Sequence, residues 1–126
     1  MIMPEIKTIE KVLRDLNKTQ GIEMSALLSR DGLLISSTME RNAETFAAMS
    51  AAMFGAAVIA AEEFGKGYPD RMIVETKNGK LIASGAGPKA MIVVMAINDS
   101  TLGQILMDLS KASDRIKEVF ENNGFE

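Results

Sequence analysis

The sequence predicts an α+β fold of element order αββαβββα, built on a five-stranded, mostly antiparallel sheet. Two observations support the strands: Asp31-Gly32 and Asn78-Gly79 are dipeptides typical of hairpin turns, and short apolar runs flank each of them. Long stretches with helical spacing at the start, middle and end of the chain support the helices. The chain has 126 residues, 47% of them hydrophobic, which suits one domain that we expect to span residues 1–126.

The first half of the chain predicts a helix, a hairpin and a second helix. Apolar residues fall on one helical face over Pro4–Asn17. The segment Ile22–Ser29 largely alternates, and after the turn Leu33–Thr38 reads as its partner strand. Asn42 is a suitable N-cap, and Glu44–Phe64 consists of good helix formers interrupted only by Gly55.

The second half predicts three strands and a closing helix. Two glycines and a proline end the long helix at Gly65–Pro69. The segments Arg71–Lys77 and Lys80–Ala86 then form a hairpin. Ala90–Ile97 is apolar throughout, which is typical of a strand buried on both faces. The spacing of Thr101 and Gln104 predicts a capping box for the last helix, which continues to Phe120.

The order of the strands follows from placing the fully apolar segment at the centre of the sheet. With one hairpin on each side of it, the simplest sheet has the order 2-1-5-4-3. The long second helix then covers one face, and the two terminal helices cover the other. The edge strands are Leu33–Thr38 and Arg71–Lys77, and such open edges invite pairing with another chain.

The long helix has apolar residues almost all the way round. One broad face consists of Phe46, Met49, Met53, Ala57, Ala60 and Phe64, and we expect it to pack on the sheet. A second stripe, which includes Ala48, Ala51, Gly55 and Ile59, is small and uncharged in its middle. Because a helix on a sheet buries one side, this second stripe needs another partner.

A second copy of the same helix is the simplest partner for that stripe, because a two-fold axis makes one patch complementary to itself. We therefore predict a homodimer, with the third strand contributing its edge. The predicted interface consists of Ala48, Ala51, Ala52, Gly55, Ile59, Met72 and Val74. Two alternatives are a monomer whose terminal helices enclose the stripe and a membrane span. The uncharged stretch is shorter than about 18 residues, which argues against a span.

The composition excludes several classes of protein. The chain has no cysteine and no histidine, so it lacks disulfides, thiolate metal sites and the usual general base of enzymes. Fourteen basic and 17 acidic residues are interspersed, and no basic stripe is present for nucleic acid. The charged N-terminal segment does not resemble a signal peptide. We expect a cytoplasmic protein that is not an enzyme and uses no cofactor or metal.

The ordered set of elements resembles the roadblock family, which includes dynein light chains and prokaryotic regulators of small GTPases. The resemblance rests on the opening helix, the strand-turn-strand Ala26–Ser36, the alanine- and methionine-rich helix Phe46–Ala61 and the final strand Met91–Ile97. It implies a dimer formed through the second helix and the third strand into a continuous sheet. It also implies docking of a Ras-like GTPase, whose own residues some bacterial members arrange for hydrolysis.

Other candidate sites have simpler interpretations. Gly85–Lys89 superficially suggests a phosphate loop, but a strand follows it, so we expect a turn. An arginine finger would be one way to assist a bound GTPase, and the arginines on or beside predicted loops and edges are Arg30, Arg41 and Arg71. We expect each of them to be solvated instead. Two carboxylate pairs, Asp31 with Asp99 and Glu62 with Glu63, are better explained by turns and exposed faces.

The apolar helix and the family resemblance together predict a homodimeric adaptor or regulator; the resemblance implies that it binds a small Ras-like GTPase and contributes positioning rather than catalytic residues. Two alternatives remain open. One is a sensory module that encloses an apolar ligand between sheet and helices. The other is a pure scaffold in a motor or signalling assembly.

Overall fold

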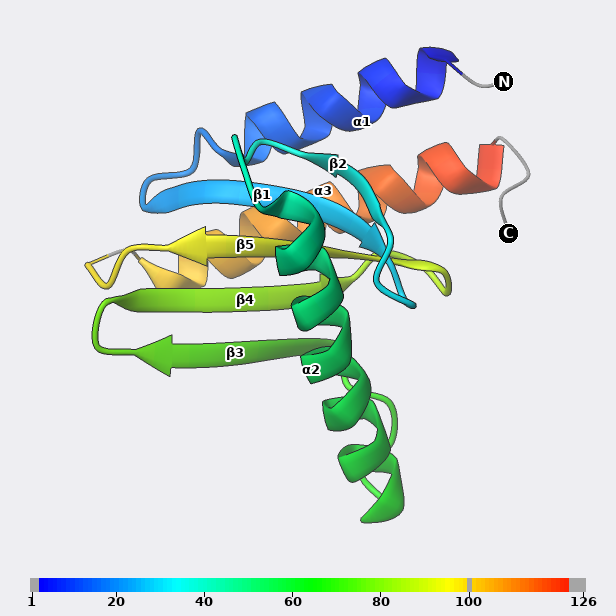
Figure 1. Ribbon diagram of the computed structural model, residues 1–126, viewed down its shortest axis with the longest axis vertical. Helices are drawn as coiled ribbons and strands as arrows, with labels where there is room; N and C mark the ends of the chain where they lie inside the picture. Colours follow the sequence, from blue (N-terminus) through cyan, green and yellow to red (C-terminus); the bar gives the residue numbers. More distant parts are fainter. Residues whose placement is uncertain (1–2, 100, 123–126) are drawn as a thin grey trace.

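The computed structural model describes residues 3–99 and 101–122 and has the predicted order of elements (Figure 1). The elements are α1 (Met3–Leu16), β1 (Ile22–Ser29), β2 (Leu34–Ser37), α2 (Ala43–Glu63), β3 (Arg71–Thr76), β4 (Gly79–Gly85), β5 (Ala90–Ala96) and α3 (Leu102–Asn122). All neighbouring strands are antiparallel, and the sheet has the order β2-β1-β5-β4-β3. The predicted strand order is therefore confirmed, with β2 and β3 at the edges.

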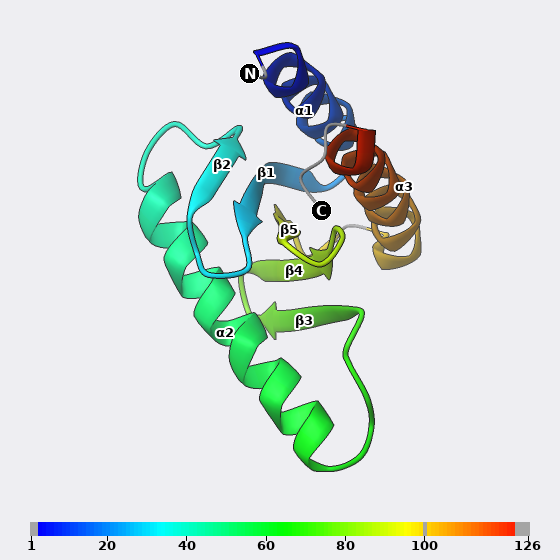
Figure 2. The same ribbon diagram turned by 90° about the vertical axis from the view of Figure 1, so that its right-hand side faces the viewer.

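The sheet separates two hydrophobic clusters. The helix α2 lies on one face of the sheet, and α1 and α3 lie side by side on the other (Figure 2). The cluster under α1 and α3 contains Ile9, Leu13, Ile92, Ile105 and Ile116, all nearly inaccessible to solvent. The cluster under α2 is smaller. The predicted placement of the three helices is confirmed, and β5 is buried on both faces as its apolar sequence indicated.

The connections differ from prediction in detail. The β1–β2 loop runs over residues 30–33, so Leu33 lies in the loop and not in the strand. The β3–β4 turn consists of Lys77 and Asn78, and Gly79 already pairs with Thr76. Asn42 stands at the N-cap of α2 as predicted, but it has a φ of 62° and its side chain makes no capping hydrogen bond.

Gly79 is required by close packing inside the sheet. A Cβ atom at this position would lie 2.7 Å from the main-chain carbonyl oxygen of Ala96 on β5. A backbone oxygen in a central strand has little freedom to move away. The glycine of the Asn-Gly pair therefore serves strand packing here and is not part of the two-residue turn.

Asp15 links α1 to α3. Its carboxylate lies 2.9 Å from Lys11 Nζ, 3.5 Å from Lys18 Nζ and 3.2 Å from a guanidinium nitrogen of Arg115. The hydrogen bonds from Lys11 and Arg115 lower the pKa of Asp15 from 3.8 to about 2. Because Arg115 is far from the others in sequence, this cluster contributes to the docking of the two terminal helices.

We expect Gly79→Ala to destabilise the protein by roughly 1–3 kcal/mol, because the added methyl overpacks a backbone contact. The measurement is the free energy of unfolding in urea. Gly103→Ala is the control: Gly103 lies in the first turn of α3, where a Cβ would have no atom within 4 Å beyond its chain neighbours and its own helix backbone, so alanine should be neutral or stabilising. Equal effects of the two substitutions would contradict this account of Gly79.

The lowered pKa of Asp15 makes the link between α1 and α3 sensitive to acid. Its stabilising contribution is complete above the unfolded-state pKa near 3.8 and disappears as the pH falls through about 2. Asp15→Asn should therefore be less stable than the wild type near neutral pH, and the difference should shrink between about pH 4 and pH 2. Urea unfolding of both proteins across this range measures it. A difference independent of pH would show that the carboxylate charge is not the cause.

Candidate interaction surface

The helix α2 crosses the sheet and continues past its β3 edge (Figures 1 and 2). Its first half packs on the sheet through Ala47, Ser50, Ala51 and Phe54, which are all buried. Beyond Phe54, the described residues of α2 are partly buried at most. The end of this apolar helix therefore extends outside the body of its own protomer.

The stripe that packs on the sheet is not the predicted one. Met49, Met53 and Phe64 were expected to face the sheet, but they are 61%, 37% and 78% exposed. At about 100° per residue they lie to one side of the buried stripe, together with Ala60. We call these four residues the methionine flank. The prediction was wrong because a helix that is apolar on all sides carries no signal for which side turns inward.

The opposite side of the buried stripe carries small residues. Ala48, Ala52, Gly55 and Ile59 are exposed there, and we call them the small-residue flank. All four belong to the predicted dimer interface. Ile59 is the largest and is 67% exposed. The prediction of a second apolar side on α2 is thus correct, and the structure contains two such flanks where one was expected.

Ala51 was predicted to lie in the dimer interface, but it is only 8% exposed. The β1–β2 loop covers it: a Cβ built on Gly32 would lie 3.5 Å from Ala51 Cβ and 3.3 Å from Ala48 Cα. Gly32 has a φ of +96°, which favours glycine, and this allows the loop to approach the helix closely. Ala51 is therefore a core residue, and the loop fixes the orientation of α2.

The strand β3 pairs with β4 on one side, and its other side is the edge of the sheet. The N–H of Gly85 donates to the carbonyl of Asp70, and Thr76 pairs with Gly79. Main-chain groups alternate in direction along an antiparallel strand. The N–H and C=O groups of the odd-numbered residues 71, 73 and 75 therefore point outward from β4.

The side chains of β3 alternate between the two faces of the sheet. Met72 packs against the cluster under α2, and alternation places Val74 on the same face. Both were predicted interface residues, and both are half-buried at the edge. Ile73 points to the opposite face and is 38% exposed. The edge thus presents apolar side chains on both faces of the sheet.

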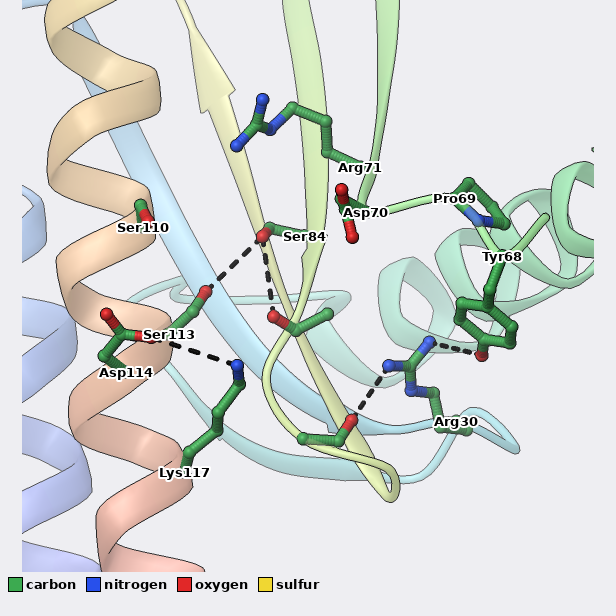
Figure 3. A pocket seen from close by; sticks show the side chains of 12 residues that line it. Arg30, Tyr68, Pro69, Asp70, Arg71, Ser84, Ser110, Ser113, Asp114 and Lys117 are labelled. Carbon is green, nitrogen blue, oxygen red and sulfur yellow. Dashed lines mark hydrogen bonds and ion pairs between the residues drawn. The ribbon is translucent and has the colours of Figure 1, made fainter. Parts of the chain in front are cut away.

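A polar cleft of about 390 Å³ lies between α3, β4 and the segment that precedes β3 (Figure 3). Its walls carry Arg30, Arg71 and Lys117 together with Asp70 and Asp114, and Ser84, Ser110 and Ser113 complete the polar lining. Positive and negative charges are therefore mixed. These walls do not match the apolar cavity that the alternative of a ligand-enclosing sensor requires.

Arg30 is held in place and is not solvated as predicted. Its guanidinium donates to the Tyr68 hydroxyl at 2.9 Å and to the Gly87 carbonyl at 2.8 Å. It also lies over the rings of Tyr68 and Phe54, 5.5 and 5.4 Å from their centroids. Arg30 therefore joins the β1–β2 loop to the segment after α2. Arg41 and Arg71 are exposed, as expected.

The remaining candidates have structural explanations. Of the segment Gly85–Lys89, Gly85 is the last residue of β4 and residues 86–89 connect β4 to β5; the N–H of Ala86 donates to the carbonyl of Ala90. Asp31 accepts a hydrogen bond from the Ser29 hydroxyl within its own loop. Within residues 3–99 and 101–122, no group of three or more acidic side chains is arranged to hold a metal ion.

Among the described helices, α2 alone is long and apolar enough to cross a membrane, judged by length and composition. In the most apolar part of the helix, 28% of the residues are buried inside the protomer. Core helices of soluble proteins meet the same criterion, so this property is weak evidence for a span. It confirms that much of the apolar surface of α2 is not covered by its own protomer.

The chain is similar to known proteins in both sequence and fold. The model of the Roadblock/LC7 domain matches residues 8–96. An uncharacterized protein of Methanocaldococcus jannaschii is 38% identical over 114 residues, covering 89% of this chain and 99% of the relative. The solved structure of Myxococcus xanthus MglB has a TM-score of 0.85 at 25% identity and covers 91% of this chain and 96% of that one. A structure described as MglB with tetrameric arrangement has a TM-score of 0.87 at 17% identity, covering 94% and 91%.

Proposed function

The chain belongs to the Roadblock/LC7 domain family, and from this premise we propose that it is a cytoplasmic, homodimeric regulator that binds a small Ras-like GTPase. It would form one roadblock-like domain and supply surface, with no catalytic residue of its own. The absence of histidine and cysteine from the sequence supports this role. Any stimulation of GTP hydrolysis would come from arranging residues of the GTPase itself.

The observation that carries the dimer is the part of α2 that extends past β3 (Figure 1). Val58 still packs against the protomer's own cluster under α2, and the part of the helix that follows it continues past the β3 edge. A second sheet joined at the β3 edge would lie directly beneath this segment. A two-fold axis at that edge would place the end of each α2 over the partner's sheet, so this segment would be buried in both protomers.

The position of the β1–β2 loop supports the choice of one flank of α2 as the proposed contact with the partner helix. The loop packs on the side of the small-residue flank, through Gly32 and Ala48. From beneath α2, β3 runs toward the opposite side (Figure 1). A partner paired along β3 therefore lies on the side of the methionine flank. We propose an interface that consists of the methionine flank, Met72 and Val74.

In the proposed arrangement the small-residue flank lies outside the dimer interface and is accessible to the GTPase. Its place in the dimer interface stays a prediction from the sequence. Two exposed aliphatic side chains lie on this side of the molecule: Ile59, and Leu33 of the β1–β2 loop. Leu33 is 68% exposed and directly follows Gly32, which touches α2. Exposed apolar groups that gather on one side of a molecule are typical of a protein-binding surface.

We expect Met53→Glu to make the free energy of dimerisation less favourable by about 2–4 kcal/mol, because it buries an unpaired carboxylate between two helices. Sedimentation over a range of concentrations measures this, and circular dichroism verifies folding. Gly55→Glu is the matched control on the other flank and should remain dimeric. The reverse result would assign the interface to the small-residue flank, as first predicted from the sequence. A wild-type protein that is monomeric at all concentrations would contradict the dimer itself.

For the GTPase, we expect purified Ras-like GTPases of the source cell to bind the dimer with a preference for one nucleotide state. Titration calorimetry with GTP-analogue and GDP forms measures the affinity. Ile59→Glu should keep the dimer and weaken GTPase binding roughly tenfold or more. If hydrolysis is stimulated, Arg41→Ala should retain the stimulation, because the chain contributes no arginine finger. Binding to none of these GTPases would leave the scaffold function.

A further inference from the structure

The pattern of residues on β3 specifies how two copies would pair. We propose that, where the β3 edges pair antiparallel in the proposed homodimer, the two-fold axis lies at Ile73, so that Ile73 faces Ile73 of the partner subunit and Arg71 faces the partner's Glu75. This inference rests on the proposed homodimer and adds its register. It uses the backbone directions, the side-chain faces and the charge order of the edge strand.

The main-chain groups favour this register. Arg71, Ile73 and Glu75 carry the outward N–H and C=O groups of β3. An axis at Ile73 places these three residues opposite the same three residues of the partner, so that every outward group finds a main-chain partner. An axis at Met72 would place Glu75 opposite a proline, Pro69, which has no N–H to donate. The axis at Ile73 therefore gives hydrogen-bond partners to more of the outward main-chain groups of β3 than the axis at Met72.

The charged side chains favour the same register. Arg71, Ile73 and Glu75 share one face of the sheet, and Arg71 and Glu75 are equally distant from Ile73 along the strand. An axis at Ile73 therefore forms two Arg–Glu pairs and one Ile–Ile pair. An axis at Val74 would instead place Arg71 opposite the partner's Lys77. Like charges directly opposite one another destabilise a strand pair, whereas opposite charges stabilise it.

The other face of the strand is also compatible with an axis at Ile73. Met72 would lie opposite the partner's Val74, and both belong to the face covered by α2. Both side chains are half-buried in the protomer, so the segment of the partner's α2 that extends past the edge would complete their burial. The register thus gives an apolar pair under the helices and charged pairs on the opposite face.

Single cysteines test the register, because the chain has none of its own. In a hydrogen-bonded antiparallel pair the Cα atoms are about 5.5 Å apart, within the range that a disulfide spans. We expect Ile73→Cys to form a covalent dimer rapidly under mild oxidation. Arg71→Cys or Glu75→Cys alone should not, because the like positions would be more than about 12 Å apart along the strand. A mixture of these two variants should cross-link. Lys111→Cys, on the exposed side of α3, gives the background rate.

Exchange of charges provides a second, independent measurement. Arg71→Glu and Glu75→Arg should each weaken their own homodimer roughly tenfold, because both pairs become repulsive. Mixed together, they should form the heterodimer in preference to either homodimer, since both pairs are then complementary. Native mass spectrometry of the mixture measures the proportions of the heterodimer and of the two homodimers.

The outcomes separate the register from the proposed function. Cross-linking at Ile73 and an excess of heterodimer support the register. A wild-type dimer with background cross-linking at Ile73, or a statistical mixture of the charge variants, would overturn the register and leave the dimer intact. A monomeric wild type would overturn both. GTPase binding is measured separately and does not depend on any of these results.

Discussion

The long apolar helix α2 cannot be covered by its own sheet, and the organisation of the protein depends on this constraint. A helix packed on a sheet buries one stripe, here Ala47, Ser50, Ala51 and Phe54. Both flanks and the end of α2 remain open, and they carry Met49, Ile59 and Phe64 in exposed positions. Each such side chain contributes about 1.5–3 kcal/mol when it is removed from water, so a surface of several strongly favours association.

The two faces of the sheet illustrate the difference between a complete and an incomplete core. On one face, α1 and α3 bury their apolar stripes and place charged residues such as Lys11, Asp15 and Arg115 toward solvent, where they pair. On the other face, α2 has no charged stripe between Glu44 and Glu62. The first face is covered within one protomer, whereas apolar side chains of the second face stay exposed. In the proposed homodimer, this asymmetry directs association to the side of α2 and to the adjacent β3 edge.

The sequence predicted the order of elements and strands because those features depend on local signals: hairpin dipeptides, a fully apolar strand and amphipathic terminal helices. It failed where the deciding contact is distant in sequence. The side of α2 that faces the sheet depends on the close approach of Gly32 to Ala48 and Ala51. The pattern of apolar residues within the helix does not reveal this contact. Arg30 resembles a solvated loop residue until Tyr68 and Gly87 are seen to hold it. Gly79 suggested a turn position, but it is needed by the neighbouring strand.

The proposed regulator would act on its GTPase by binding one arrangement of it better than another, and this requires a rigid surface. Self-pairing provides rigidity when the edge strand matches its own reverse. The strand β3 carries Arg71, Ile73 and Glu75 at alternate positions. When two such strands pair antiparallel about Ile73, each arginine lies opposite a glutamate of the other strand. The same order would be unfavourable for parallel pairing in register, which brings like charges together. The charge order of β3 therefore favours antiparallel self-association over random contact at an exposed edge.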